Sequence, residues 1–165
     1  MFGRDRKSNK IESRPYGNKV SQGHMFELMK RTFDESEWKY SAKPEDFAIL
    51  TSFMGNDLPI NIIISVREQS FHITCLLDVE APIDKYSEIC WNLNEINHNL
   101  AFGSFNLDSE NGKMLFEYGM VFVESNMSTD LLREIIRMIV NTVDEHDGDL
   151  KKITERPSSM GPMYG

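Results

Sequence analysis

Residues 58–79, LPINIIISVREQSFHITCLLDV, decide the fold. Two runs rich in β-branched residues are separated at Glu68 and Gln69, which is typical of a hairpin. Within each run the apolar and polar side chains alternate, so each strand has one apolar and one polar face. The sequence therefore predicts two antiparallel strands that bury one face and leave the other largely in contact with water.

Further strands are predicted on both sides of this hairpin. A Gly55-Asn56-Asp57 turn separates it from an earlier strand, and Asn111-Gly112 is a strong signal for a tight turn in a later hairpin. The later hairpin ends in a strand that is apolar on both faces. The predicted strands are residues 38–40, 46–54, 58–67, 70–79, 101–107 and 113–123.

Three amphipathic helices are predicted between and after these strands, each with apolar residues at helical spacing. Ser21 and Ser128 are the candidate N-caps of the first and last helices. In the second helix Cys90 falls on the apolar stripe, whereas Trp91 falls nearly opposite to it. The predicted helices are residues 21–34, 84–100 and 129–143.

These elements predict one α+β domain over residues 21–147, because a chain of 165 residues with 40% hydrophobic content can bury one sizeable core. We expect an antiparallel sheet with the helices packed on one face, in the order α-β-β-β-α-β-β-α, with residues 38–40 as a short additional strand. Residues 148–165 gather Gly, Pro and Ser and are expected to form a flexible tail.

Charge is unevenly distributed along the chain. Residues 1–20 carry six basic and two acidic side chains, net +4, so the other 145 residues carry 12 basic and 24 acidic ones, net −12. An acidic body repels nucleic acid, which is therefore not an expected partner. The basic arm either contacts phosphate or an acidic partner, or is simply a disordered terminus.

The chain is expected to be cytoplasmic and free of membrane-spanning segments, because no apolar run reaches about 18 residues. Its two cysteines, Cys75 and Cys90, lie in apolar stretches without C-x-x-C spacing or histidines at ligand spacing. They indicate buried thiols in a reducing compartment, not a disulfide or a metal site.

Catalytic chemistry has little support in the sequence. Neither a glycine-rich phosphate loop nor a G-x-S-x-G motif is present. Cys75 and His72 alternate to opposite strand faces, and the carboxylates at 144–149 do not match a calcium-loop spacing. We therefore expect no enzyme, catalytic residue, metal or cofactor. One alternative stays open: a small-molecule sensor or enzyme with a pocket between sheet and helices, near His72, Thr74 and Asn97.

Apolar residues predicted outside the core favour a protein-binding function. Trp91 faces away from the apolar stripe of its helix, and an exposed tryptophan is a common interface anchor. On the 113–123 strand, Leu115, Val121 and Val123 oppose the apolar face formed by its other residues. These four residues are the predicted protein-binding site, and the partner is another protein or a second copy in a homodimer.

Two motifs carry a family resemblance. Leu93-Asn94-Glu95-Ile96-Asn97, followed by Phe102-Gly103-Ser104-Phe105-Asn106-Leu107-Asp108, resembles the YbjN-like family over residues 21–147. That family is similar in fold to type III secretion chaperones, small acidic proteins that commonly dimerise and hold partner polypeptides. The resemblance implies a non-catalytic bacterial protein, either a regulator of sensory transduction or a chaperone-like binder, and it brings no catalytic residues.

Overall fold

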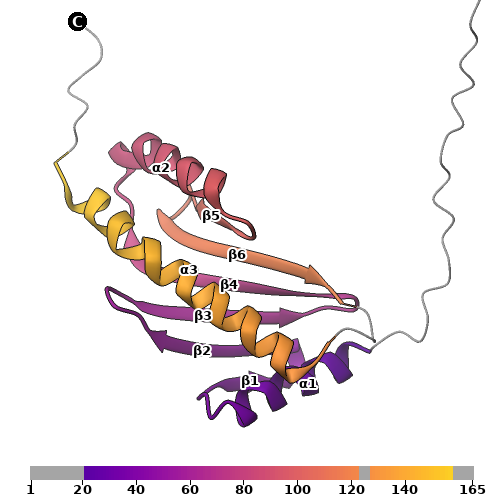
Figure 1. Cartoon of the computed structure of the whole chain (residues 1–165). Helices are drawn as coiled ribbons and strands as arrows, with labels where there is room; N and C mark the ends of the chain where they lie inside the picture. The colour runs from indigo at the N-terminus through magenta and orange to yellow at the C-terminus, as the bar shows by residue number, and fades with distance from the viewer. Residues whose placement is uncertain (1–20, 123–126, 158–165) are drawn as a thin grey trace, which may run out of the picture.

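The computed structural model describes residues 21–122 and 127–157. At its centre is a six-stranded antiparallel sheet with the strand order β1-β2-β3-β4-β6-β5 (Figure 1). The strands are β1 (Ser41–Lys43), β2 (Ala48–Met54), β3 (Pro59–Val66), β4 (Ser70–Glu80), β5 (Ser104–Leu107) and β6 (Lys113–Val121). The α-helices are α1 (Gln22–Glu35), α2 (Tyr86–Asn99) and α3 (Thr129–Glu155).

Strands β2, β3 and β4 form the predicted meander. Ile62 of β3 pairs with Thr51 of β2 on one side and with Cys75 of β4 on the other. This register places the apolar residues of neighbouring strands on one face of the sheet. The chain then crosses through α2 and returns as the β5–β6 hairpin, in which β6 pairs with β4 and β5 becomes the edge strand.

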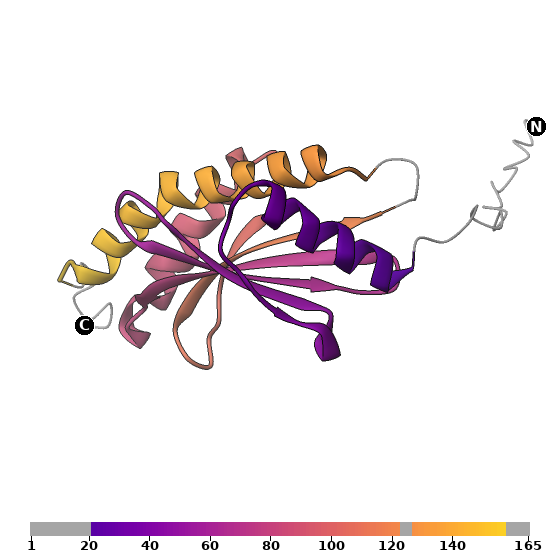
Figure 2. The same cartoon turned by 90° about the horizontal axis from the view of Figure 1, so that it is seen from below.

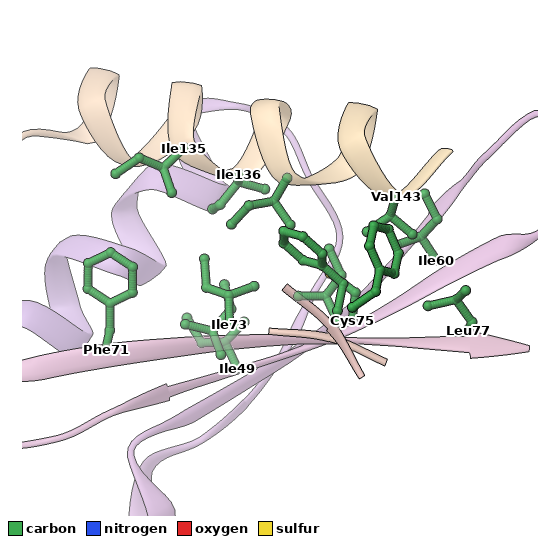
Figure 3. Close-up of a cluster of buried hydrophobic side chains, with 14 of the residues drawn as sticks. Ile49, Ile60, Phe71, Ile73, Cys75, Leu77, Ile135, Ile136 and Val143 are labelled. Atoms are coloured by element: carbon green, nitrogen blue, oxygen red, sulfur yellow. The ribbon is translucent and has the colours of Figure 1, made fainter. Parts of the chain in front are cut away.

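All three helices lie on the same side of the sheet (Figure 2). The core fills the space between them, with Ile136 and Val143 of α3 above Ile73 and Cys75 of β4 (Figure 3). Ser21 and Ser128 cap α1 and α3, because their hydroxyl oxygens accept hydrogen bonds from backbone N–H groups two or three residues into each helix. The predicted fold class is therefore confirmed.

The short first strand lies later than predicted. It begins at Ser41, whereas residues 38–40 lead into it from α1. The ring of Trp38 packs edge-on against Phe33 of α1 and Phe53 of β2, with centroids 5.6 and 5.2 Å apart. Because Phe33 also packs against Tyr40, the aromatic side chains tie this stretch to the end of α1.

The predicted end of the last helix at residue 143 is wrong, because α3 continues to Glu155. Leu150 and Ile153 are buried and extend the apolar face of the helix by three turns. The buried side chain of Lys85 also holds the end of α3, since its Nζ donates hydrogen bonds to the carbonyl oxygens of Ile153, Thr154 and Arg156. Residues 148–155 are thus helix and not tail.

Several predictions fall outside the described residues. The basic arm at 1–20, Val123, and residues 158–165 of the predicted tail belong to this group. Within the described ranges, no helix is both long enough and apolar enough to cross a membrane.

Candidate functional site

The exposed side of α2 presents the tryptophan that the sequence singles out. Trp91 has 67% of its surface exposed. Ser87, Asn94 and His98 are exposed at spacings of four, three and seven residues from it, so they share its side of the helix. None of these side chains carries a fixed charge, whereas Glu88 and the exposed Glu95, three and four residues from Trp91, place two carboxylates on its other flank.

Cys90 belongs to this exposed side, and its predicted burial is wrong. The helix lies against the edge strand β5 and has a smaller contact with α3, so it buries only Ile89 and Leu93 completely. The apolar stripe is therefore narrower than the sequence pattern indicates. As a result Cys90 and Cys75 do not meet across the core. We call Ser87, Cys90, Trp91, Asn94 and His98 the α2 surface.

Leu115 and Val121 lie on a different surface. Both are on β6, where the alternating residues Met114 and Phe116 are buried beneath the helices. Leu115 and Val121 consequently face the side of the sheet that carries no helix (Figure 2). Val121 is 70% exposed, whereas Leu115 is half-buried among its strand neighbours. The structure thus separates the predicted site into two parts and does not bring Trp91 together with Leu115 and Val121.

An apolar row crosses this uncovered face. Leu50 pairs directly with Ile63, and Leu76 pairs directly with Leu115. Ile63 and Leu76 are diagonal neighbours, because Ile63 pairs with Thr74, two residues before Leu76. We call Leu50, Ile63, Leu76 and Leu115 the sheet row. All four are half-buried, so they shield one another without a covering layer.

Sequence reasoning missed two strongly exposed apolar residues. Met54, at the end of β2, is 85% exposed, and Ile83, just before α2, is 82% exposed. The β2 alternation gives a signal for Met54, since it lies on the same face as Leu50. Ile83 follows Pro82 at the turn into the helix, and no periodic pattern covers it.

Neither a Cys75–His72 pair nor a cluster of metal ligands forms within the described residues. Burial raises the pKa of the Cys75 thiol to about 12, so it remains an inert thiol in the core. His72 is exposed on the opposite face of β4, as predicted. Among residues 21–122 and 127–157, no group of three His, Cys, Asp or Glu side chains could hold a metal ion.

The residues of the open alternative do not gather around a pocket either. His72 and Thr74 lie on the uncovered sheet face, whereas the amide of Asn97 binds the backbone of Phe105. A shallow cavity of about 270 Å³ lies elsewhere, at one end of β3, β4 and β6. Its lining includes Leu76, Asp78 and Lys113 but no helix residue. This cavity is not the pocket between sheet and helices that the alternative requires.

The two motifs that carry the family resemblance have structural explanations. Asn97 accepts a hydrogen bond from the Phe105 N–H at 2.8 Å and donates one to the Phe105 carbonyl at 2.9 Å. Gly103 has a φ of +65°, and a side chain there would collide with the Phe116 ring and the Glu117 carbonyl. Both motifs therefore help to join α2 to the edge of the sheet.

Comparison with known proteins gives a consistent family and fold. A family model named YbjN and described as "Putative bacterial sensory transduction regulator" matches residues 26–151. The crystal structure of YbjN from E. coli, described as "a putative transcription regulator", is similar with a TM-score of 0.59 and 9% identity, covering 80% of this chain and 93% of that one. No curated protein sequence matches the chain.

Two further solved structures share this fold. An uncharacterized protein from Methanothermobacter thermautotrophicus has a TM-score of 0.55 and 16% identity, with 78% of this chain and 97% of that one covered. A chain of the HopA1–SchA chaperone–effector complex has a TM-score of 0.53 and 12% identity, with coverages of 79% and 98%. At these identities the likeness establishes the architecture only.

Proposed function

Because this chain belongs to the YbjN family, we propose that it acts by binding other polypeptides and not by catalysing a reaction. Both the family description as a regulator of sensory transduction and the chaperone–effector complex of the same fold support a binding role. The proposal assigns this role to the α2 surface and the uncovered face of the sheet.

The exposure of Trp91 is the observation that carries the proposal. The domain has a filled core of aliphatic and aromatic side chains, yet it leaves 67% of its second tryptophan exposed. Burying a large apolar side chain in an interface stabilises the complex by about 2–3 kcal/mol. Tryptophan is also among the residues that contribute most to protein interfaces.

The α2 surface suits association with a second copy. In a two-fold interface, residues near the axis meet their own counterparts, so charged residues there would repel one another. The residues named as the α2 surface carry no fixed charge, and the carboxylates of Glu88 and Glu95 lie on the other flank of Trp91. We assign homodimerisation to this surface, with Trp91 on the side that borders the two glutamates.

The uncovered sheet face suits an extended partner segment. The sheet row forms an apolar line across four strands, and Val121 adds an exposed apolar side chain on the same face. Side chains of a partner segment would pack against this line, while the α2 surface remains available for the second copy. Trp91 thus belongs to one proposed surface, and Leu115 and Val121 belong to the other.

Recovery of the protein with its partners from its native cells tests this assignment. Wild type, Trp91→Ala and Val121→Ser would be compared, with Met138→Ala as the matched control. Met138 is also partly exposed, at 37%, but lies on α3 and belongs to neither surface. We expect the same polypeptide to be recovered with wild type and the control, and to be lost with Val121→Ser. Recovery of wild type without any bound polypeptide would contradict the proposal.

A further inference from the structure

A buried carboxyl group interrupts the apolar face of α3. Asp147 is fully buried, and within the described part of the chain neither of its carboxylate oxygens has a hydrogen-bond partner. It lies one turn after Val143 and one turn before Leu150, both of which are core residues. Burying an unpaired carboxylate at such a place costs much free energy, whereas burying the neutral acid costs far less.

The turn between β2 and β3 packs against this part of α3. The Asn56 backbone N–H and side-chain amide both donate hydrogen bonds to the Asp144 carboxylate, each at 2.5 Å. The carboxylate of Asp57 lies against Gly148, where a Cβ would come within 2.4 Å of it and would force the Asp57 side chain to shift. The turn thus approaches the helix closely at this glycine.

Three carboxyl groups, those of Asp57, Asp144 and Asp147, thus lie near enough to one another for the first two to act on the charge of the third. Burial raises the pKa of Asp147 to about 6, and the charges of Asp144 and then Asp57 add to this rise. The Gly148 N–H, which lies near the carboxylate without the geometry of a hydrogen bond, lowers the pKa in part. The positively charged side chains nearby interact with groups other than the Asp147 carboxylate. Lys152 interacts with Asp149 and Asp57, and Lys85 of the segment before α2 binds the carbonyls that end α3. On the sheet side, the residues beneath α3 are apolar, including Ile60 and Leu77.

We propose that the contact between the β2–β3 turn, residues 55–58, and α3 is a proton-operated latch that is closed when Asp147 is protonated and loosened when it is ionised. On ionisation, a local opening that admits water relieves the cost of the buried charge. Because closing raises the pKa of Asp147, the proton favours the closed form. The proton on Asp147 stabilises the closed form fully below about pH 4, and this stabilisation is lost as the pH rises through about 6.

Hydrogen exchange of the full chain at pH 5 and pH 7.5, corrected for the intrinsic rate at each pH, tests the latch. We expect protection of residues 55–58 and 144–150 to be about tenfold higher at pH 5, the ratio that follows from pKa values of about 3.8 in the open form and about 6 in the closed form. The Asp147→Asn variant imitates the protonated acid and is expected to abolish this difference. Equal pH dependence in wild type and Asp147→Asn would overturn the proposal.

Two further variants sharpen the test. Asp149→Asn is the matched control, because Asp149 is exposed on the same helix and its pKa is lowered by Lys152, so the difference between pH 5 and 7.5 is expected to persist. Asp57→Asn removes a neighbouring charge and is expected to move the loss of protection to lower pH. It tests the latch even if Asp147→Asn fails to fold. Two results would count against the latch. One is a loss of protection at the same pH in Asp57→Asn as in wild type, and the other is the absence of any pH-dependent loss in Asp149→Asn.

Discussion

The Asn97 side chain pairs with the backbone of Phe105 as a neighbouring strand would. Its side-chain amide forms two hydrogen bonds to the backbone of Phe105, which lies in the edge strand β5. The groups that β5 would otherwise leave unpaired at its free edge are satisfied by α2 instead. This relationship positions α2, and with it the α2 surface, relative to the sheet.

The Asn97→Ala variant is expected to lower the free energy of unfolding by about 1–2 kcal/mol, because both polar groups of Phe105 lose their partner. Urea unfolding measures this loss. Asn99→Ala is the control, since the Asn99 amide donates only to the Glu95 carbonyl of its own helix. Equal unfolding midpoints for the two variants would contradict a special role for Asn97.

Sequence reasoning succeeds best where one periodicity holds over a whole element. The alternation in residues 58–79 predicts the buried faces of β3 and β4, from Ile60 and Ile62 to Phe71 and Ile73. It fails where a tertiary contact overrides the local pattern. Gly148 resembles a helix stop but lies inside α3 with the Asp57 carboxylate beside it, and Asp147 breaks the apolar stripe that would otherwise predict the last turns of α3.

Replacing Gly103 by alanine is expected to destabilise the fold by more than about 1 kcal/mol, because its φ is +65° and the new methyl group would collide with Phe116. Gly23→Ala in α1 is the matched control. Its nearest contact would be Ser21 Oγ at 4.0 Å, so we expect no loss of stability there. Thermal unfolding of both variants distinguishes a required glycine from a replaceable one.

The Lys85→Met variant is expected to lower the free energy of unfolding by about 1.5–3 kcal/mol. It removes the ammonium group that binds the last carbonyls of α3, in a residue that is only 4% exposed. Faster hydrogen exchange at residues 150–156 should accompany the loss. Lys152→Met is the control, because Lys152 is exposed and pairs with Asp149 on the surface. A similar loss in both variants would contradict the assigned cap.

Thiol labelling at neutral pH is expected to modify one cysteine in each folded chain. Cys90 is exposed, whereas Cys75 is buried and its pKa is raised to about 12, so its thiolate is scarce and inaccessible. Cys90→Ser should abolish labelling until urea unfolds the protein. Rapid labelling of folded Cys90→Ser would show that Cys75 is accessible, contrary to the structure.

The sequence could identify Trp91 as exposed, but it could not show on which side of the sheet Trp91 lies. Helical spacing places Trp91 away from the stripe of α2, and strand alternation places Leu115 and Val121 opposite Met114 and Phe116. Whether these surfaces meet depends on which face of the sheet α2 covers, and that follows from tertiary packing. The separation into an α2 surface and an uncovered sheet face therefore required the structure.

Light scattering over a range of protein concentrations tests the central proposal most directly. Wild type is expected to have twice the monomer mass of 19.1 kDa, and Trp91→Ala is expected to have the monomer mass with an unchanged unfolding midpoint, because Trp91 contributes little to the core of one chain. Met138→Ala should remain dimeric. A wild type that stays at 19.1 kDa at every concentration, with no difference in Trp91→Ala, would contradict the assignment of the α2 surface to self-association.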